Sequence, residues 1–426
     1  MSQTTTPRGA AGTVVASTVG NFVGATPMVH AVFGSFLLPL CGEFGWPRAG
    51  VSGVLGVVAL AGALCYPLAG RLADRYGARR IILFGNPLFA AALMALSLAD
   101  GKLSRFYLLF TLVGVSAAIP STVLYTKVVS GWFRQRRGLF LGLTAGVGNG
   151  AGATLMPIAA AVLIADFGWR GAYIGLGLIV LLLGFPFLLL LLHDPPVAAS
   201  ADDATEAATG PGFSPGFNLG QARRTTTFWT ILAAIALGAG SMTAVFAHVI
   251  PMLLDRGMPM PLATTVLSIF ALVAVIWQIS IGHLLDRVRT PRIALPFYLC
   301  ALAGVLLFQH AATLPQLLLA AGLMGIGLGT EYGVLPYYIS RYFGLPSYGA
   351  IYGVIYGTVV LTMGITPFLM DRVFDATASY DHAIYAIAAA LAVGAALIAR
   401  LRPYEDLHES RPLTADAAPM RPCGTG

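Results

Sequence analysis

Residues 70–80 read GRLADRYGARR, a short polar stretch between two long apolar segments. A similar stretch, GHLLDRVRTPR, occupies residues 282–292 and again lies between apolar segments. Asp74 and Asp286 are 212 residues apart, and other glycines, prolines and tyrosines of the two halves repeat at nearly this separation. A separation shared by several markers indicates a duplicated structural unit. The sequence therefore predicts two halves with the same architecture.

The composition of the chain places both halves in a lipid bilayer. Of the 426 residues, 57% are hydrophobic and 10% are charged, and the mean hydropathy is +0.79. Ordinary soluble domains carry about 25% charged residues, so this chain has too few to cover a surface that faces water. The net charge is +7, but the basic residues form no stripe with interleaved aromatic residues, which argues against nucleic-acid binding. The four cysteines lack metal-binding spacing, and we expect neither a metal nor a cofactor.

Apolar segments of about 20 residues, the length that crosses a bilayer core, recur along the whole chain. We predict transmembrane helices at about residues 13–41, 49–72, 80–99, 104–130, 138–165, 171–192, 227–254, 261–284, 291–309, 315–340, 347–371 and 382–400. Lipid offers the backbone no hydrogen-bonding partner, and the segments are too long for barrel strands. The expected fold is therefore an all-α membrane protein with twelve transmembrane helices in two pseudo-symmetric six-helix bundles.

A segment rich in Pro, Gly, Ala and polar residues divides the chain near its middle. This composition is typical of a solvated linker. We predict an N-terminal bundle over 1–193, a cytoplasmic linker over 194–226, a C-terminal bundle over 227–402 and a disordered cytoplasmic tail over 403–426. Most arginines fall on one side of the predicted spans, which places both termini in the cytoplasm. We expect a multi-pass plasma membrane protein of the bacterial inner membrane, with a first helix that is not cleaved.

The stretch at 70–80 also resembles a family motif. It matches G-x-L-a-D-R-x-G-x-[RK]-[RK], the loop between the second and third helices of the major facilitator superfamily. The matching residues are Gly70, Leu72, Asp74, Arg75, Gly77, Arg79 and Arg80, and a weaker copy has Gly282, Asp286 and Arg287. The resemblance covers residues 13–402. It implies a two-bundle fold that transports a solute by alternating access.

Three further stretches are similar to the bacterial monocarboxylate and oxalate/formate exchanger branch of this superfamily. They are FGSFLLPLCGEFGWPRAGVS (33–52), WFRQRRGLFLGLTAGVGNGAG (132–152) and FGWRGAY (167–173). The chain departs from that branch in its eighth helix, where monocarboxylate carriers have an Asp and, four residues on, an Arg that pairs with the substrate carboxylate. Here Ala274 and Gln278 stand at those positions. Glutamine can donate a hydrogen bond to a carboxylate but supplies no charge.

Four ionisable side chains lie well inside the predicted spans, in helices one, four, seven and ten: His30, Lys127, His248 and Glu331. The resemblance implies that these helices line the central cavity. Ionisable groups inside a membrane usually mark a substrate or proton path. We predict that Glu331, His30 and His248 act in proton coupling, since an imidazole or a buried carboxyl group can take up and release a proton. The alternatives are that Lys127 snorkels to the cytoplasm and that the other side chains are only hydrogen-bonded in place.

Further polar residues of the cavity helices are candidates for substrate binding and gating. The predicted substrate-binding residues are Gln278, Asn149, Lys127, Tyr332, Tyr337 and Tyr356. Helix packing is the alternative role for the asparagine and the tyrosines. The predicted gating residues are Gly70, Asp74, Arg75, Gly77, Asp286 and Arg287. An aspartate at such a loop can cap a helix N-terminus in one conformation only, as a gate requires.

These patterns predict a secondary active transporter of a small organic solute. The most specific hypothesis is symport of an organic anion, such as a mono- or dicarboxylate or an aromatic acid, with protons by a monomer. One alternative is proton-antiport efflux of an amphipathic compound, favoured by the missing arginine and the tyrosine-rich lining. Another is a solute receptor that does not transport. The sequence has no HExxH, GxSxG or Walker A motif, so we do not predict an enzyme.

Overall fold

The computed structural model describes residues 8–133, 136–195, 216–288 and 290–404, except the side chains of Arg8, Arg48, Ala49, Met260 and Tyr332. Every regular element in these ranges is helical, which confirms the expected all-α class. Most of the predicted linker and nearly all of the predicted tail lie outside the described residues.

Eleven helical stretches of the described chain are long and apolar enough to cross a membrane. One of them, Arg137–Leu191, has 55 residues. It would reach about 80 Å as one helix, far beyond a bilayer core of about 30 Å. The stretch is broken at Gly168, whose φ of 68° and ψ of 173° only glycine adopts readily. Divided there, it contains two crossings, and the prediction of twelve transmembrane helices is confirmed.

The first bundle contains the elements up to residue 195. They are α1 (Arg8–Phe22), a π-helical turn (Thr26–Ala31), α2 (Phe33–Phe44), α3 (Arg48–Tyr76), α4 (Ala78–Ala95), a 3-10 turn (Leu96–Leu98), α5 (Leu103–Ala117), α6 (Thr122–Trp132), α7 (Arg137–Gly142), a π-helical turn (Leu143–Val147), α8 (Gly148–Ile179), a π-helical turn (Val180–Gly184) and α9 (Phe185–Leu191). The first crossing changes its winding at Pro27 and the fourth is interrupted at Pro120. Proline has this effect because it lacks the amide hydrogen that continues a helix.

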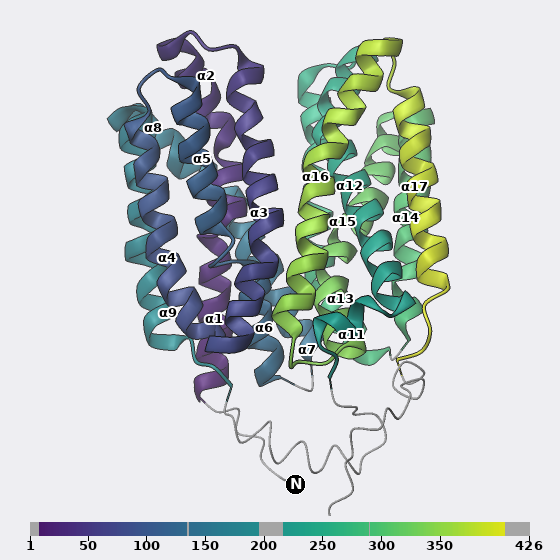
Figure 1. Ribbon diagram of the computed structural model, residues 1–426. Coiled ribbons are helices and arrows are strands. Elements are labelled where there is room, and N and C mark those ends of the chain that lie inside the picture. Colours follow the sequence, from purple (N-terminus) through teal and green to yellow (C-terminus); the bar gives the residue numbers. More distant parts are fainter. Residues whose placement is uncertain (1–7, 134–135, 196–215, 289, 405–426) are drawn as a thin grey trace, which may run out of the picture.

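The second bundle contains the elements after residue 216. They are α11 (Leu219–Arg223), α12 (Thr226–Asp255), α13 (Met260–Arg287), a 3-10 turn (Pro291–Ala294), α14 (Leu295–His310), α15 (Leu314–Tyr342), α16 (Tyr348–Thr377) and α17 (Asp381–Ala399). Figure 1 shows the two bundles side by side, with the start of α1 and the end of α17 at the same end of the molecule.

Apolar packing holds each bundle together and also joins the two. One cluster lies within the first bundle around Phe36 and Phe89, and another lies within the second bundle around Phe270. A third cluster spans both bundles and includes Tyr66 of α3 and Tyr352 of α16. Each bundle thus has an apolar core of its own, and the third cluster packs the two bundles against each other.

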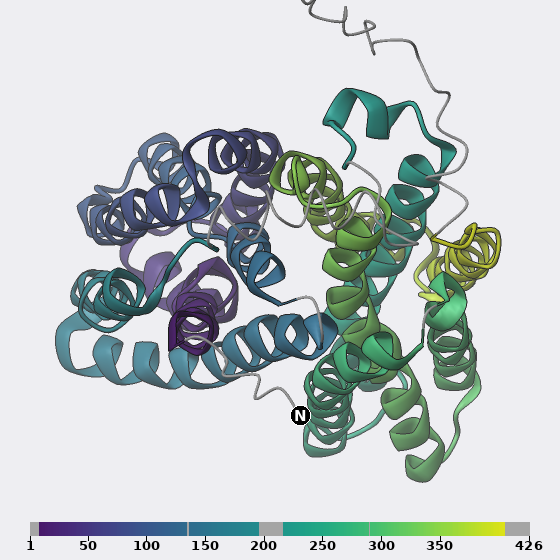
Figure 2. The ribbon, with the colours of Figure 1, turned by 90° about the horizontal axis from the view of Figure 1, so that it is seen from below.

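This contact lies at the end of the molecule that carries Arg71, Arg79, Arg137, Arg223 and Arg287, which we call the basic end. The sequence predicts that the basic end is cytoplasmic. Here α3 packs against α16, and α7 packs against α13. The helices of the two bundles diverge toward the opposite end in Figure 1, and Figure 2 shows α3 next to α16 when the molecule is viewed from below.

Small residues allow the close approach at the basic end. On α3, Gly70, Tyr66 and Ala63 contact glycines of α16 through backbone atoms; these glycines are Gly349, Gly353 and Gly357. Glycine permits such backbone contact between membrane helices. On the same face of α3, nearer the opposite end, a Cβ added at Gly56 would meet no atom within 4 Å. The contact between the bundles therefore ends before Gly56.

Candidate functional site

Asp74, the aspartate of the first motif, joins the two bundles at the basic end. It lies in the last turn of α3 and accepts hydrogen bonds from Gly349 N at 3.1 Å and Ala350 N at 2.8 Å. These amides belong to the first turn of α16, where backbone donors have no partner within the helix and the dipole is positive. A Cβ on Gly70 would overlap the Gly349 carbonyl, so this contact requires glycine there.

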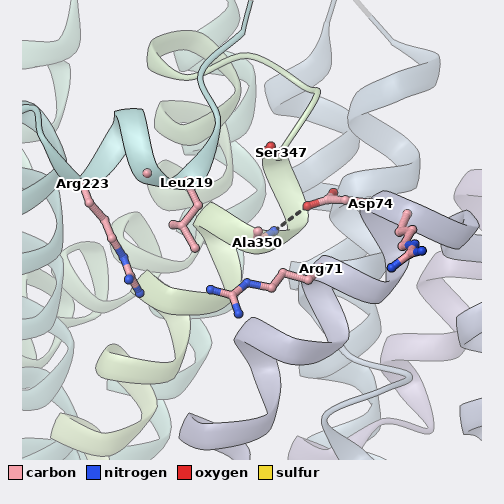
Figure 3. Close-up of a pocket in the computed structure, with 8 residues that line it drawn as sticks. Arg71, Asp74, Leu219, Arg223, Ser347 and Ala350 are labelled. Atoms are coloured by element: carbon pink, nitrogen blue, oxygen red, sulfur yellow. Dashed lines mark hydrogen bonds between the residues drawn. The ribbon is translucent and has the colours of Figure 1, made fainter.

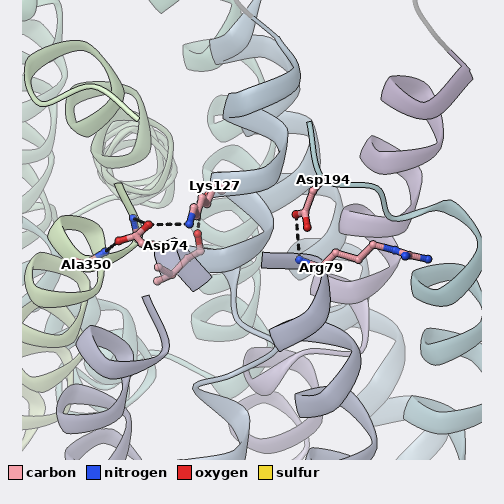
Figure 4. A network of polar contacts seen from close by, with 8 residues as sticks. Asp74, Arg79, Lys127, Asp194 and Ala350 are labelled. Atoms are coloured by element: carbon pink, nitrogen blue, oxygen red, sulfur yellow. Dashed lines mark hydrogen bonds and ion pairs between the residues drawn. The ribbon is translucent and has the colours of Figure 1, made fainter. Parts of the chain in front are cut away.

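Lys127 of α6 completes what we call the first gate contact. Its Nζ lies 2.7 Å from Asp74 Oδ1, and the two side chains are only 17% and 14% exposed (Figure 4). In this conformation the lysine therefore balances the gate aspartate. Its predicted role in substrate binding stays a prediction.

Asp286, the aspartate of the second motif, makes the equivalent second gate contact. It accepts hydrogen bonds from Gly138 N at 2.8 Å and Leu139 N at 2.9 Å, in the first turn of α7. A Cβ on Gly138 or Gly282 would overlap the carbonyl of the other glycine. Within the described ranges, no lysine or arginine pairs with Asp286. The repeated motif thus places one aspartate of each half on a helix N-terminus of the other.

The remaining predicted gating residues lie around these contacts. Gly77 connects α3 to α4 with a φ of 88°, which favours glycine. The Arg75 guanidinium lies 5.2 Å from the centre of the Tyr76 ring, and Arg287 is exposed at the end of α13. Asp194, which the sequence analysis did not single out, accepts a hydrogen bond of 3.0 Å from Arg79 N at the start of α4 (Figure 4).

An open pocket of about 510 Å³ lies beside the first gate contact. It is lined by Arg71, Asp74, Arg75, Leu219, Gly220, Arg223, Ser347 and Ala350. The side chains of Arg71 and Arg223 extend toward each other across it in Figure 3. The pocket is positively charged and belongs to the surface at the basic end, away from the middle of the membrane.

A smaller, uncharged pocket lies deeper in the molecule. It is lined by Asn21, Gly24, Ala25, Thr26, Tyr66, Pro120, Ser121, Thr122, Asn149 and Tyr356. Thr122 lies ten residues before the end of α6, and Tyr66 lies ten residues before the end of α3. Both are therefore about 15 Å from the basic end of their helices, near the centre of a bilayer. We call this the midplane pocket.

Hydrogen bonds connect the polar side chains of the midplane pocket. The Thr122 hydroxyl donates to Asn21 Oδ1 at 2.5 Å, and Asn149 Nδ2 donates to Thr122 Oγ1 at 3.4 Å. The Tyr66 ring of the first bundle meets the Tyr356 ring of the second bundle edge-on, with centres 5.1 Å apart. The pocket thus offers amide and hydroxyl groups from one bundle and an aromatic wall from both.

Two of the six predicted substrate-binding residues, Asn149 and Tyr356, line the midplane pocket. Gln278 instead packs against Gly142 and Gly146 in the contact between the bundles. Tyr337 accepts a hydrogen bond of 3.2 Å from Arg341 Nε near the basic end. The side chain of Tyr332 lies outside the described part of the structure.

Asn21, Thr122 and Tyr66, which the sequence did not lead us to predict, complete the midplane pocket. The available signal was an uncharged polar or phenolic side chain inside an apolar span. Such residues are weak indicators of a binding site, because their usual role in membrane proteins is hydrogen bonding between helices.

Glu331 does not line the midplane pocket. It is 4% exposed, and its carboxyl group lies inside the second bundle, in space that Gly238 of α12 leaves free next to the Tyr298 hydroxyl of α14. Its Oε2 atom has no hydrogen-bond partner, and no cation pairs with it among the residues that the structure describes. The predicted role of Glu331 in proton coupling stays a prediction.

The two histidines predicted for proton coupling lie apart from each other. His30 is on an exposed side of the π-helical turn Thr26–Ala31, with Nδ1 3.4 Å from the Ala25 carbonyl. His248 lies on α12, toward the opposite end and outside the midplane pocket. The predicted role of both histidines in proton coupling stays a prediction.

Known proteins share the sequence pattern and the fold. The Major Facilitator Superfamily sequence model matches residues 21–367. Monocarboxylate transporter 11 of Mus musculus is 29% identical over 328 residues, which cover 74% of this chain and 71% of that protein. The 3-(3-hydroxy-phenyl)propionate transporter of Escherichia coli (strain K12) is 28% identical over 311 residues, which cover 70% of each protein.

A solved structure extends the likeness to three dimensions. The crystal structure of the E. coli fucose:proton symporter matches with a TM-score of 0.68 at 14% identity, covering 91% of this chain and 98% of that one. At such low identity this match supports the fold alone. Because the family model covers most of the sequence and the fold agrees, the chain belongs to the major facilitator superfamily.

Proposed function

We propose that this major facilitator superfamily transporter moves a small organic anion, a mono- or dicarboxylate or an aromatic acid, together with protons. The names of two relatives, a monocarboxylate transporter and a hydroxyphenylpropionate transporter, support an organic acid as substrate. We further propose that it works as a monomer in the bacterial inner membrane. Its termini and the linker over 194–226 would lie in the cytoplasm, between bundles over 1–193 and 227–402.

The two gate contacts are the observation that supports an alternating-access mechanism. Asp74 and Asp286 each bind a helix N-terminus of the other bundle through hydrogen bonds alone. Such bonds can break without deforming either bundle. If the basic end is cytoplasmic, the present conformation is closed to the cytoplasm, and separating both contacts would open it there. Contacts that exist in one state only are what a two-state switch requires.

Lys127 connects the gate to an anionic substrate in this proposal. The midplane pocket is lined by uncharged side chains, and Lys127 lies five residues beyond Thr122 on the same helix. That is about 7.5 Å along the helix axis. In the present conformation Lys127 is paired with Asp74. When the first gate contact opens, the substrate carboxylate takes the place of Asp74, so that the cation stays paired.

Glu331 is our candidate for the proton that accompanies the anion. Among the described residues no cation pairs with its carboxyl group, and one of its oxygens has no hydrogen-bond partner. Its proton occupancy therefore depends on whether the surrounding helices admit water. His30 and His248 are the other candidates.

A second function has its own support. Gln278 stands where the monocarboxylate branch has an arginine, and the midplane pocket combines uncharged groups with two tyrosine rings. This lining also suits an amphipathic compound exported in exchange for protons. A receptor that binds its solute without transport is the third candidate.

Flux measurements on the full chain in proteoliposomes separate these functions. The panel contains a monocarboxylate, a dicarboxylate, a hydroxyphenyl acid and a lipophilic cation, each with and without a pH gradient. We expect uptake of an acid that an acidic exterior drives and a protonophore abolishes. Proton-driven export of the cation would instead support the second function. Binding without flux of any compound would support a receptor and contradict both transport proposals.

A further inference from the structure

A histidine and an aspartate form a pair near the opposite end of the second bundle. His248 lies seven residues before the end of α12, and Asp371 lies six residues before the end of α16. The Nε2 atom of His248 is 2.8 Å from Asp371 Oδ1. The other ring nitrogen, Nδ1, is 2.8 Å from the Ala244 carbonyl oxygen. Both nitrogens of the ring are therefore engaged.

These partners determine how many protons the pair holds. A backbone carbonyl can only accept a hydrogen bond, so Nδ1 carries a proton. If neither Nε2 nor the carboxyl group carried a second proton, two lone pairs would face each other at hydrogen-bond distance. The pair therefore holds one more proton, as an imidazolium beside a carboxylate or as a neutral imidazole beside a carboxylic acid. This proton is shared between α12 and α16.

The two members of the pair differ in their access to the surroundings. The His248 side chain is 7% exposed, whereas the Asp371 side chain is 61% exposed. A proton can thus reach the carboxyl group from outside the bundle and pass to an imidazole that is enclosed by helices. The transfer moves a proton between an oxygen and a nitrogen and changes no other bond.

A tyrosine and two further aspartates lie near the pair. The Tyr380 ring lies 5.6 Å from the imidazole, centre to centre, and stacks on Phe374. Burial, and after it the carboxylates of Asp371, Asp255 and Asp375, raise the pKa of the Tyr380 phenol, which is therefore neutral at physiological pH. Arg372 follows Asp371 in the chain and makes no ion pair within the described ranges.

The same helix, α16, takes part in the first gate contact. Its N-terminal amides bind Asp74 at the basic end, while Asp371, 21 residues after Ala350, ties it to α12 near the opposite end. We propose that the His248–Asp371 pair is the proton-loading site at the opposite end, and that the loaded proton holds α16 against α12. Losing this proton would remove the tie and free the outer part of α16. The inference rests on the proton symport proposed above and adds the site and the side from which the proton enters.

Variants of the full chain in proteoliposomes test this site. His248→Gln keeps a donor for Asp371 but cannot carry the additional proton, and Asp371→Asn removes the carboxylate. His310→Gln is the matched control, since His310 lies at the same end and its Nε2 is 3.5 Å from the Tyr385 hydroxyl, away from the pair. We expect both pair variants to lose uptake driven by a pH gradient and to keep substrate exchange at equal pH. The control should keep both activities, and wild-type pH dependence in His248→Gln would overturn the inference.

A measurement without substrate keeps this test separate from the proposed function. Nitrogen NMR of ¹⁵N-histidine-labelled chain identifies the His248 ring by its absence from the His248→Gln spectrum. We expect Nδ1 to be protonated and the Nε2 resonance to report a shared proton, and this resonance should shift in Asp371→Asn and not in His310→Gln. This result supports the proton site even if no organic acid is transported. A His248 Nε2 resonance that is identical in wild type and Asp371→Asn would overturn the site, whatever the transport result.

Discussion

The two gate contacts share their geometry and differ in their charge. Asp74 and Asp286 each accept two backbone amides from the N-terminus of a helix in the other bundle. Asp74 also pairs with Lys127 at 2.7 Å. No cation of the described chain pairs with Asp286. The repeated motif thus supplies two equivalent hydrogen-bonded contacts, and among the described residues the first contact alone includes an ion pair to its aspartate.

Because of this difference, the free-energy cost of opening the contact differs between the two gates. A lysine inside a membrane protein is costly without a counter-ion, so Lys127 depends on Asp74 or on a substitute anion. In the described part of the chain no lysine or arginine pairs with Asp286, so opening the second gate contact breaks hydrogen bonds and no ion pair of its aspartate. We therefore expect the first contact to respond to an anionic substrate and the second to act in closure alone.

The largest effect should come from preventing the first gate contact by steric overlap. In Gly70→Leu the added side chain meets the Gly349 carbonyl, and α3 can no longer approach α16. Uptake in proteoliposomes should be lost. A thiol-reactive probe should label a cysteine introduced between the bundles at the basic end, which would show that this end has opened. Gly56→Leu is the matched control on the same face of α3, where a Cβ meets no atom within 4 Å. Equal loss of uptake in both variants would argue against a steric cause.

The next effect isolates the ion pair. Asp74→Asn keeps an acceptor for α16 but leaves Lys127, which is largely buried, without a counter-charge. The variant should lose about 3 kcal/mol of stability, as expected for removing one partner of a buried pair. Thermal unfolding measures the loss. The double variant with Lys127→Met should recover most of it, and no recovery would show that the pairing is not the cause.

The corresponding change at the second gate contact should be milder. Asp286→Asn keeps one acceptor oxygen for the amides of Gly138 and Leu139 and breaks no ion pair among the described residues. We expect a loss of about 1.5 kcal/mol, the value of a hydrogen bond to a charged group. Unfolding of the Asp74→Asn and Asp286→Asn variants under the same conditions measures the difference. Equal losses would contradict the proposed asymmetry.

A smaller effect should appear at the midplane pocket. Thr122→Val keeps the shape of the side chain and removes the hydroxyl that links Asn21 to Asn149. If substrate binds there, its KM should rise about fivefold, corresponding to roughly 1 kcal/mol for one hydrogen bond. Thr111→Val is the control, since the Thr111 hydroxyl donates a hydrogen bond to the Tyr107 carbonyl of its own helix. A KM that is unchanged in Thr122→Val would place the substrate elsewhere.

The smallest effect should come from an exposed ion pair, which gives a scale for the buried one. Arg105 Nη1 lies 2.6 Å from Asp100 Oδ2 in a loop at the opposite end. The hydrogen bond from Arg105 lowers the pKa of the Asp100 carboxyl group. Its contribution is therefore present at neutral pH and disappears as the pH falls through the lowered pKa. Asp100→Asn should lower the melting temperature slightly at pH 7, less than Asp74→Asn does, and leave it unchanged in acid below that pKa.

Much of the fold was predictable because each span carries its own signal. A membrane helix must satisfy its backbone internally and bury about 20 apolar residues, so every crossing is recognisable without knowledge of its neighbours. The only merged pair, within Arg137–Leu191, is divided by Gly168 between the two predicted segments. The motif residues Asp74 and Asp286 were also placed correctly at one end, because their position relative to the spans determines it.

The site was predictable only in part. Asn149 and Tyr356 line the midplane pocket, but their partners Asn21 and Thr122 were not singled out. Asp371 lies at the end of the predicted span 347–371 and is therefore not among the ionisable residues predicted well inside the spans, yet it pairs with His248. In each case the missing information was a contact between helices far apart in the sequence.

The sequence by itself determined the helical class, the number of crossings, the duplication and the residue types available inside the membrane. These follow from hydropathy and from repeated spacing, which are properties of the chain read one segment at a time. Only the tertiary structure decided that Lys127 reaches Asp74 and that Glu331 points into the second bundle. Successive helical residues are rotated by about 100°, so the direction of a side chain depends on how its helix is turned against its neighbours. Packing sets that rotation, and the hydropathy of a span does not contain it.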